Sequence, residues 1–251
     1  MRIALISDIH GNCGALDAVL EDLGGRSVER MVCLGDAIQG GPRPAETVAR
    51  LREMGCPVVM GNADAWLLTG EETGAEKPAT ERMRAIRAWQ LEQLSAEDQA
   101  FVAAFVPTVE VELPDGRLLL CFHGSPDSFD DIILPTTPDD EARRLLGESG
   151  AAVFTGGHTH LQQVRRFGDA LFVNPGSVGF AFDRHQPEDN FQADHWAECA
   201  VLSVENGRFG LEFRRVPFDV AAVVRQAFDG GMPEPDAFAA RYQGRDGGGG
   251  A

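Results

Sequence analysis

The sequence predicts an α/β fold whose sheet is built from successive strand–helix units. Short apolar runs rich in β-branched residues alternate with segments of helical spacing over the first sixty residues. Later in the chain, two pairs of apolar runs flank tight-turn residues, which is typical of β-hairpins. The chain of 251 residues is long enough for one large domain, or for one domain with an inserted cap.

Two strand–helix units open the chain. The run 3–6 predicts a strand, and residues 12–23 carry apolar side chains at helical spacing until two glycines end the pattern. The run 31–34 and the segment 42–54 repeat this arrangement, and 57–60 is a third run with the character of a strand. Helical crossovers connect parallel strands, so we expect these strands to lie parallel in one sheet.

Helices and hairpins follow. The composition of residues 65–107 is helical, with a helix start at Ser95, and we expect this segment to form a small cap-like insertion. Residues 109–122 and 198–216 predict hairpins, each around a turn that contains glycine. Further strands are predicted at 151–154 and 171–173.

The domain organisation is simple. We expect a single domain over residues 1–243, which ends in a helical segment at 217–243. The segment 244–251 is rich in glycine and is predicted to be disordered. No internal repeat is present in the sequence.

The charge balance is strongly acidic, with a formal net charge of −17. Affinity for nucleic acid depends on Lys and Arg that neutralise phosphates, so double-stranded nucleic acid is not an expected partner. A small phosphorylated substrate is compatible with this charge, because bound metal ions can reverse its sign locally. No apolar run reaches the ~20 residues of a membrane span, and no membrane partner is expected. The oligomeric state is left open.

The five cysteines are odd in number and have no CxxC spacing. Several of them lie in apolar runs predicted to be strands, so we expect buried, reduced thiols rather than a disulfide framework. The first residues enter a predicted strand directly and carry no signal-peptide pattern. Both observations favour a cytoplasmic location.

Motifs rich in metal-ligating residue types follow several predicted strands. Four of the six histidines occupy these motifs. Because the ends of neighbouring strands converge at one edge of a sheet, residues far apart in sequence can meet there. In chain order the motifs are Asp8-Ile9-His10, Gly35-Asp36, Gly61-Asn62, Phe122-His123-Gly124 and Gly157-His158-Thr159-His160.

This order of motifs resembles that of the calcineurin-like metallophosphoesterase superfamily. The segment Asn174-Pro175-Gly176-Ser177 is similar to the small bacterial phosphodiesterase branch, and the resemblance extends over about residues 1–216. It implies a four-layer αββα sandwich, in which two packed mixed sheets are flanked by helices. It also implies two divalent metal ions at the strand ends and the hydrolysis of phosphate esters.

The chemistry of such a site explains the ligand types. Two divalent ions ~3.5 to 4 Å apart neutralise a phosphate ester and create a bridging hydroxide nucleophile. Mixed nitrogen and oxygen ligands suit Mn, Fe, Zn, Ni or Co better than magnesium, without choosing among them. By resemblance, Asp36 bridges the ions, and the catalytic residues are Asp8, Asp36, Asn62 and His123. One metal is then held by Asp8, His10 and His160, and the other by Asn62, His123 and His158.

Each motif residue also has a structural interpretation. Asp8 and Asp36 are of a type that caps the helices that follow, and Asn62 after a glycine is typical of a turn. A nucleotide-cofactor site is not favoured, because the N-terminal unit lacks the G-x-G-x-x-G spacing. The concentration of histidines in the motifs favours the metal site over these alternatives.

Substrate contacts are less clearly marked. The segment 174–177 is either a tight turn or a substrate contact. Asn12 and Arg184 are candidate contacts to the phosphate or its attached group, and Arg184 is alternatively a surface residue.

One position departs from the family pattern. Many members carry a His directly after the metal-binding Asn, and here that residue is Ala63, which leaves Asp64 without its usual partner. Loss of a general acid costs about 10²- to 10⁴-fold for a poor leaving group, which favours phosphodiesters or activated esters. His185 and His195 are candidate substitutes or, alternatively, exposed loop residues.

These observations predict a dinuclear metal-dependent phosphoesterase, with a phosphodiesterase as the first choice and manganese among the candidate ions. Within the same class, the alternative is a phosphomonoesterase or nucleotide phosphohydrolase. From another class, the alternative is a non-catalytic metal-binding interaction module that has kept the fold.

Overall fold

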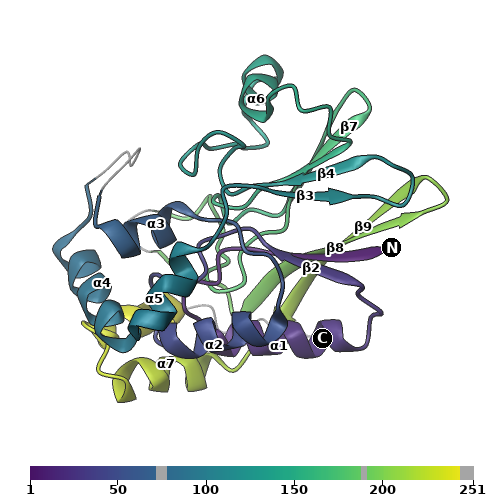
Figure 1. Ribbon diagram of the computed structural model, residues 1–251. Helices are drawn as coiled ribbons and strands as arrows, with labels where there is room; N and C mark the ends of the chain where they lie inside the picture. The colour runs from purple at the N-terminus through teal and green to yellow at the C-terminus, as the bar shows by residue number, and fades with distance from the viewer. Residues whose placement is uncertain (72–77, 188–190, 244–251) are drawn as a thin grey trace.

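The computed structural model describes residues 1–71, 78–187 and 191–243. Two mixed β-sheets pack face to face, and helices lie on their outer faces (Figure 1). Most of the labelled helices gather on one side of this sandwich, and α6 (Asp139–Leu146) lies on the other. The predicted αββα sandwich is therefore confirmed.

The first sheet has the strand order β2-β1-β8-β9. β1 (Arg2–Ile6) runs parallel to β2 (Arg30–Cys33) and antiparallel to β8 (Trp196–Glu205). β8 and β9 (Arg208–Pro217) form the predicted hairpin, with Asn206 at positive φ in its turn. The two predicted crossover helices are α1 (Cys13–Gly24) and α2 (Pro44–Met54).

The second sheet has the order β3-β4-β5-β7-β6. Its three central strands are parallel, and each edge strand pairs antiparallel with its neighbour. β3 and β4 form the other predicted hairpin. The strands are β3 (Val109–Glu112), β4 (Leu118–Cys121), β5 (Val153–Thr155), β6 (Gln163–Phe167) and β7 (Ala170–Asn174).

β1 contributes to two cores, because successive side chains of a strand point to opposite faces of the sheet. Ala4 and Ile6 pack with residues of α1 and α2, whereas Ile3 and Leu5 pack between the two sheets. All four side chains are fully buried. Burial on both faces explains why this strand is a continuous apolar run in the sequence.

Three helices occupy the region predicted to be helical and cap-like. Ser95 starts the last of them with a capping box, in which its hydroxyl accepts the N–H of Asp98 and the Asp98 carboxylate accepts the N–H of Ser95. Side chains of this region join the same core as α1 and α2. That these helices form a cap beside the site stays a prediction. The helices are α3 (Asn62–Thr69), α4 (Glu81–Gln93) and α5 (Ala96–Ala103).

The C-terminal region packs an aromatic cluster beside α4. Phe180, Phe238 and Tyr242 are buried in it, with their ring centroids 5.7 to 6.3 Å apart. This cluster fixes Phe180, whose ring edge faces His10. The helices of this region are α7 (Val220–Asp229), α8 (Pro235–Ala239) and the 3-10 turn η2 (Ala240–Tyr242).

One predicted strand is wrong, and one strand was not predicted. Residues 57–60 make only isolated bridges, to β2 and to Val106, and Pro57 at their start has no N–H to donate to a ladder. β6 escapes prediction because Gln163 is buried while Val164 is 53% exposed, the reverse of the usual polarity.

Two predicted segments reach beyond the described residues: 72–77 belong to the helical region, and 244–251 are the glycine-rich tail. Within the described ranges, no helix combines the length and apolarity needed to cross a bilayer. All five cysteines are free, as expected for reduced thiols, and all but Cys56 are buried.

Candidate metal centre

The candidate ligands come together from both sheets. Asp8 follows β1 and Asp36 follows β2 in the first sheet, whereas His123 follows β4 in the second. His158 and His160 follow β5, so the carboxyl ends of parallel strands supply these side chains, as predicted. They form two groups, Asp8 with His10 and His160, and Asp36 with His123 and His158, and within each group the ligand atoms lie within 4.8 Å of one another.

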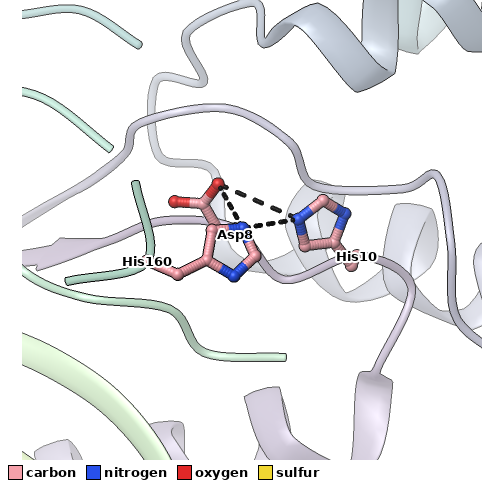
Figure 2. Close-up of side chains that lie close together, drawn as sticks. All are labelled: Asp8, His10 and His160. Carbon is pink, nitrogen blue, oxygen red and sulfur yellow. Dashed lines mark hydrogen bonds and ion pairs between the residues drawn. The ribbon is translucent and has the colours of Figure 1, made fainter. Parts of the chain in front are cut away.

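The first group surrounds a buried, unsatisfied oxygen. Asp8 is fully buried, and its Oδ1 makes no hydrogen bond. His160 Nε2 lies 3.2 Å from this oxygen and His10 Nε2 lies 3.9 Å from it, with the two nitrogens 3.1 Å apart (Figure 2). A buried carboxylate oxygen without a donor is costly. A cation held between these three atoms would satisfy it.

The second group is linked to the first through Asp36. Asp36 Oδ2 lies 3.3 Å from His123 Nε2 and 3.9 Å from His10 Nε2, which belongs to the first group. Asn62, at the start of α3, places its Oδ1 3.0 Å from His123 Nε2. One oxygen of Asp36 therefore faces both groups, and the amide of Asn62 completes the second.

The histidine rings are held in one tautomer. The Nδ1–H of His10 donates to the Gln39 carbonyl at 2.7 Å, and that of His160 donates to the Phe180 carbonyl at 2.7 Å. His123 Nδ1–H donates to the Leu34 carbonyl at 2.8 Å. In the neutral ring, each bond keeps the proton on Nδ1 and leaves the Nε2 lone pair directed into the site, which is how metal-ligating histidines are usually oriented. The carbonyls of these loops have no sequence signature, so this support could not be predicted.

The backbone is strained at the candidate ligands. The side-chain-bearing residues at positive φ in the described part of the chain include five of them, with φ between 49° and 65°. Such residues cost about 1–3 kcal/mol each and cluster at functional sites. Local packing alone does not call for five strained residues in one place. The five are Asp8, His10, Asp36, His158 and His160.

Two glycines allow the carboxylates to approach the backbone. A Cβ on Gly61 would lie 2.1 Å from Asp36 Oδ1, and one on Gly157 would lie 2.8 Å from Asp8 Oδ2. Both glycines directly precede a candidate ligand, Asn62 and His158. The Gly-Asn and Gly-His dipeptides thus reflect close packing around the two Asp side chains.

Asp64 has a different role from the one its sequence position suggested. It is fully buried, and its carboxylate accepts the N–H of Ala37 at 3.0 Å and of Ile38 at 2.9 Å. Asp36 Oδ1 in turn accepts the N–H of Ala63 at 2.8 Å. Burial, together with the charge of Asp36, raises the pKa of Asp64 to about 7. Asp64 therefore has hydrogen-bond partners in the backbone, although position 63 carries no imidazole.

Burial and neighbouring charges shift the pKa values of the site residues in different directions. Burial, with the neighbouring His123, lowers the pKa of His158 to about 4. For His123, burial acts against the charged form, but the carboxylate of Asp36 outweighs it and the pKa rises to about 9. Burial likewise opposes ionisation of Asp36, yet its pKa falls below the ordinary value because of His123. A compact set of opposite charges of this kind is typical of a functional site.

The helix-cap interpretation of the two Asp residues is excluded. α1 is capped by Asn12, whose Oδ1 accepts the N–H of Ala15 at 3.1 Å, and α2 has Arg43 at its N-cap. Asn12 Nδ2 also donates to the Gly179 carbonyl at 3.1 Å, and the side chain is 1% exposed. Both polar atoms of Asn12 are thus engaged within the protein.

The segment 174–177 supports the ligand loops. Asn174 Nδ2 donates to the Gly157 carbonyl at 2.6 Å, and Ser177 Oγ donates to the Asp8 carbonyl at 2.8 Å. These bonds fix the loops that carry Asp8 and His158. The sequence predicted a turn or a substrate contact here, and not the support of the ligand loops. The available signal was the position of polar Asn174 at the end of β7.

The remaining sequence candidates lie at the edge of the site or away from it. Arg184 is exposed, donates its Nη1–H to the Thr159 carbonyl at 3.1 Å and lines a cavity with His160. The His185 side chain is 97% exposed, and His195 Nε2 lies 2.9 Å from the Tyr242 carbonyl. His185 lines the same cavity as His160, and among the described residues neither His185 nor His195 forms a hydrogen bond or ion pair with the two ligand groups.

Known proteins are similar to this chain in structure or in sequence. A metallophosphoesterase from Sphaerobacter thermophilus has a crystal structure with a TM-score of 0.71, 25% identity, and coverage of 96% of this chain and 98% of its own. The uncharacterized protein MJ0912 of Methanocaldococcus jannaschii is 26% identical over 92% of this chain and 94% of its own length. The phosphodiesterase YfcE of Escherichia coli is 29% identical over 71% of this chain and 79% of its own length.

A family model agrees with these relatives. The calcineurin-like phosphoesterase superfamily domain matches residues 1–206, which include both ligand groups and all strands of the second sheet. The strand-end motifs, the two packed mixed sheets and this match point the same way. The chain belongs to the calcineurin-like phosphoesterase superfamily.

Proposed function

We propose that this protein hydrolyses phosphate esters with two divalent transition-metal ions, and that phosphodiesters are its preferred substrates. The observation that carries the proposal is the position of Asp36 Oδ2, 3.3 Å from His123 Nε2 and 3.9 Å from His10 Nε2. One carboxylate oxygen facing two ligand groups is the arrangement that a pair of neighbouring ions requires.

The residues divide between the two ions. Asp8, His10 and His160 would hold one, and His123, His158 and Asn62 the other, with Asp36 between them. The nitrogen-rich donor set suits Mn, Fe, Zn, Ni or Co. Two such ions supply positive charge to the phosphate and an activated water as nucleophile.

The residues around the centre orient the candidate metal ligands, and position 63 provides no general acid. The Nδ1–H bonds of His10, His123 and His160 hold their Nε2 atoms toward the centre, and Asp64 holds the loop that carries Asp36. At position 63, where an imidazole would donate a proton to the departing oxygen, the methyl group of Ala63 has no proton to give.

The absence of an acid at position 63 supports diesters over unactivated monoesters. The similarity to the phosphodiesterase YfcE of Escherichia coli favours the same substrate class. A small phosphorylated substrate fits the acidic net charge of −17 better than a polyanion does. The five free thiols favour a reducing compartment, the cytoplasm, as the location.

The test compares two nitrophenyl esters on protein reconstituted with Mn, Ni, Co or Zn. Bis-p-nitrophenyl phosphate should be hydrolysed with a higher kcat/KM than p-nitrophenyl phosphate, because both release the same leaving group and only the first is a diester. Faster turnover of the monoester would favour a phosphomonoesterase instead. No turnover of either ester with any metal would favour the interaction module.

A further inference from the structure

A cavity of about 300 Å³ lies directly beside the candidate metal centre. His160 and the two residues after it form part of its wall. The loop at Phe182 and Arg184, Asp194 and the paired strands β8 and β9 form the rest. A volume of this size accommodates a small organic group. If a phosphate is bound at the metals, as the proposed function requires, an alcohol esterified to it can extend into this cavity.

The charged side chains that line the cavity differ in how deeply they are buried. Glu198 and Asp194 line it and are 5% and 6% exposed. Its guanidinium groups lie further out, since Arg184 is exposed and the Arg215 side chain is 62% exposed. Arg215 Nε donates to Glu198 Oε1 at 3.1 Å. Beside His160, the buried part of the wall therefore carries two carboxylates, whereas the two guanidinium groups lie toward solvent together with the half-exposed carboxylate of Asp183.

These buried carboxylates determine which chemical groups can bind at the inner end of the cavity. Charges interact more strongly in a poorly solvated cavity than in water, and an anionic group pushed toward Glu198 would be repelled. A hydroxyl donor or a cation would be attracted by the same carboxylate. Phe182 and Trp196 line the cavity too, and their rings offer apolar surface to the carbon atoms of such a group.

We infer that this cavity binds the alcohol portion of the phosphoester and selects a neutral or cationic alcohol over an anionic one. The inference deepens the proposed function and rests on it for the position of the phosphate. Glu198 is the residue that sets the selectivity, and Arg215 moderates it by partly neutralising Glu198.

The test is calorimetric titration of metal-saturated protein with inorganic phosphate and three monoesters. Phosphocholine carries a cationic alcohol, glycerol 1-phosphate a neutral one and phosphoglycolate an anionic one, while the phosphate group is common to all. The expected order of affinity is phosphocholine, then glycerol 1-phosphate, then phosphoglycolate, with about a tenfold ratio between the extremes, because one charge pair at partial burial is worth about that much.

Substitutions at the cavity wall should change the ratio of the affinities for phosphocholine and phosphoglycolate in opposite directions. Glu198→Gln should reduce it toward one, and Arg215→Gln, at an exposed position, should increase it. Glu205→Gln changes an exposed Glu at the far end of the same strand and should leave it unchanged.

Two results would overturn the inference while inorganic phosphate still binds: equal wild-type affinity for phosphocholine and phosphoglycolate, or a ratio that moves in neither Glu198→Gln nor Arg215→Gln. Failure of metal-saturated wild-type protein to bind inorganic phosphate would instead contradict the proposed function.

Discussion

Asp36 and Asp64 are each bonded to the backbone next to the other. Asp36 Oδ1 accepts the N–H of Ala63 at 2.8 Å, and Asp64 Oδ2 accepts the N–H of Ala37 at 3.0 Å. This reciprocal pair joins the loop after β2 to the first turn of α3. It therefore fixes Asp36 relative to Asn62, a candidate ligand of the second metal.

The first prediction follows from this pair. In Asp64→Asn, the amide can accept from only one of the two N–H groups of Ala37 and Ile38, and it turns an N–H toward the other. A buried donor left unpaired costs about 1–3 kcal/mol. Metal affinity should fall about 10- to 100-fold, as it does when other supports of metal ligands are lost. The measurement is competitive titration with a metallochromic chelator.

Asp169→Asn is the matched control, since Asp169 is exposed in the turn between β6 and β7. It should bind metal as the wild type does. Unchanged metal affinity in folded Asp64→Asn would show that the bonds from Ala37 and Ile38 do not position Asp36.

The second prediction concerns the close approach at Gly61. In Gly61→Ala, the new Cβ would lie 2.1 Å from Asp36 Oδ1, so the carboxylate has to move away from both ligand groups. We expect at least a tenfold loss of metal affinity. Gly24→Ala serves as the control, because a Cβ there meets nothing within 4 Å. Metal titration that gives equal affinities for the two variants would contradict the packing argument.

The third prediction concerns the missing acid. Ala63→His introduces an imidazole with an unperturbed pKa of about 6.5 at the position where many relatives carry one. Esters with poor leaving groups should gain more in rate than nitrophenyl esters, whose leaving group needs little protonation. The measurement is the slope of log kcat/KM against leaving-group pKa, at matched metal occupancy.

A shallower slope in Ala63→His than in the wild type is the expected outcome. Asp64 already accepts two backbone N–H groups, so the expected gain does not depend on its pairing with the added imidazole. Coincident slopes would mean either that this imidazole does not reach the leaving oxygen or that another group already acts as acid.

The two groups of candidate ligands could be anticipated from the sequence because of where they lie. Asp8, Asp36 and His123 each follow a short apolar run, and the ends of parallel strands converge whatever the loops do. The alternation of apolar runs and helical segments predicts the strand–helix units, whereas the sandwich of two packed sheets was implied by the resemblance to the metallophosphoesterase superfamily. The run 57–60 is apolar like the strands, but Pro57 has no N–H for pairing, and β6 is too polar in composition to be predicted.

The supporting interactions are not predictable in this way. Asp64, Asn174 and Ser177 act on backbone N–H or carbonyl groups, which every residue has, so nothing in the sequence marks their partners. The positive φ of Asp8 and of His158 likewise depends on the surrounding loops. The cavity beside His160 combines residues more than fifty positions apart, which single-sequence reasoning does not bring together.

The most direct test of the whole account is the number of metal ions bound per chain, measured by elemental analysis after saturation and removal of free metal. We predict two ions for the wild type. Asp36→Asn should impair binding at both sites because Asp36 Oδ2 faces both groups, whereas Asp8→Asn should impair mainly one. At most one ion in the saturated wild type, or the loss of a single ion in Asp36→Asn, would contradict the shared-carboxylate centre.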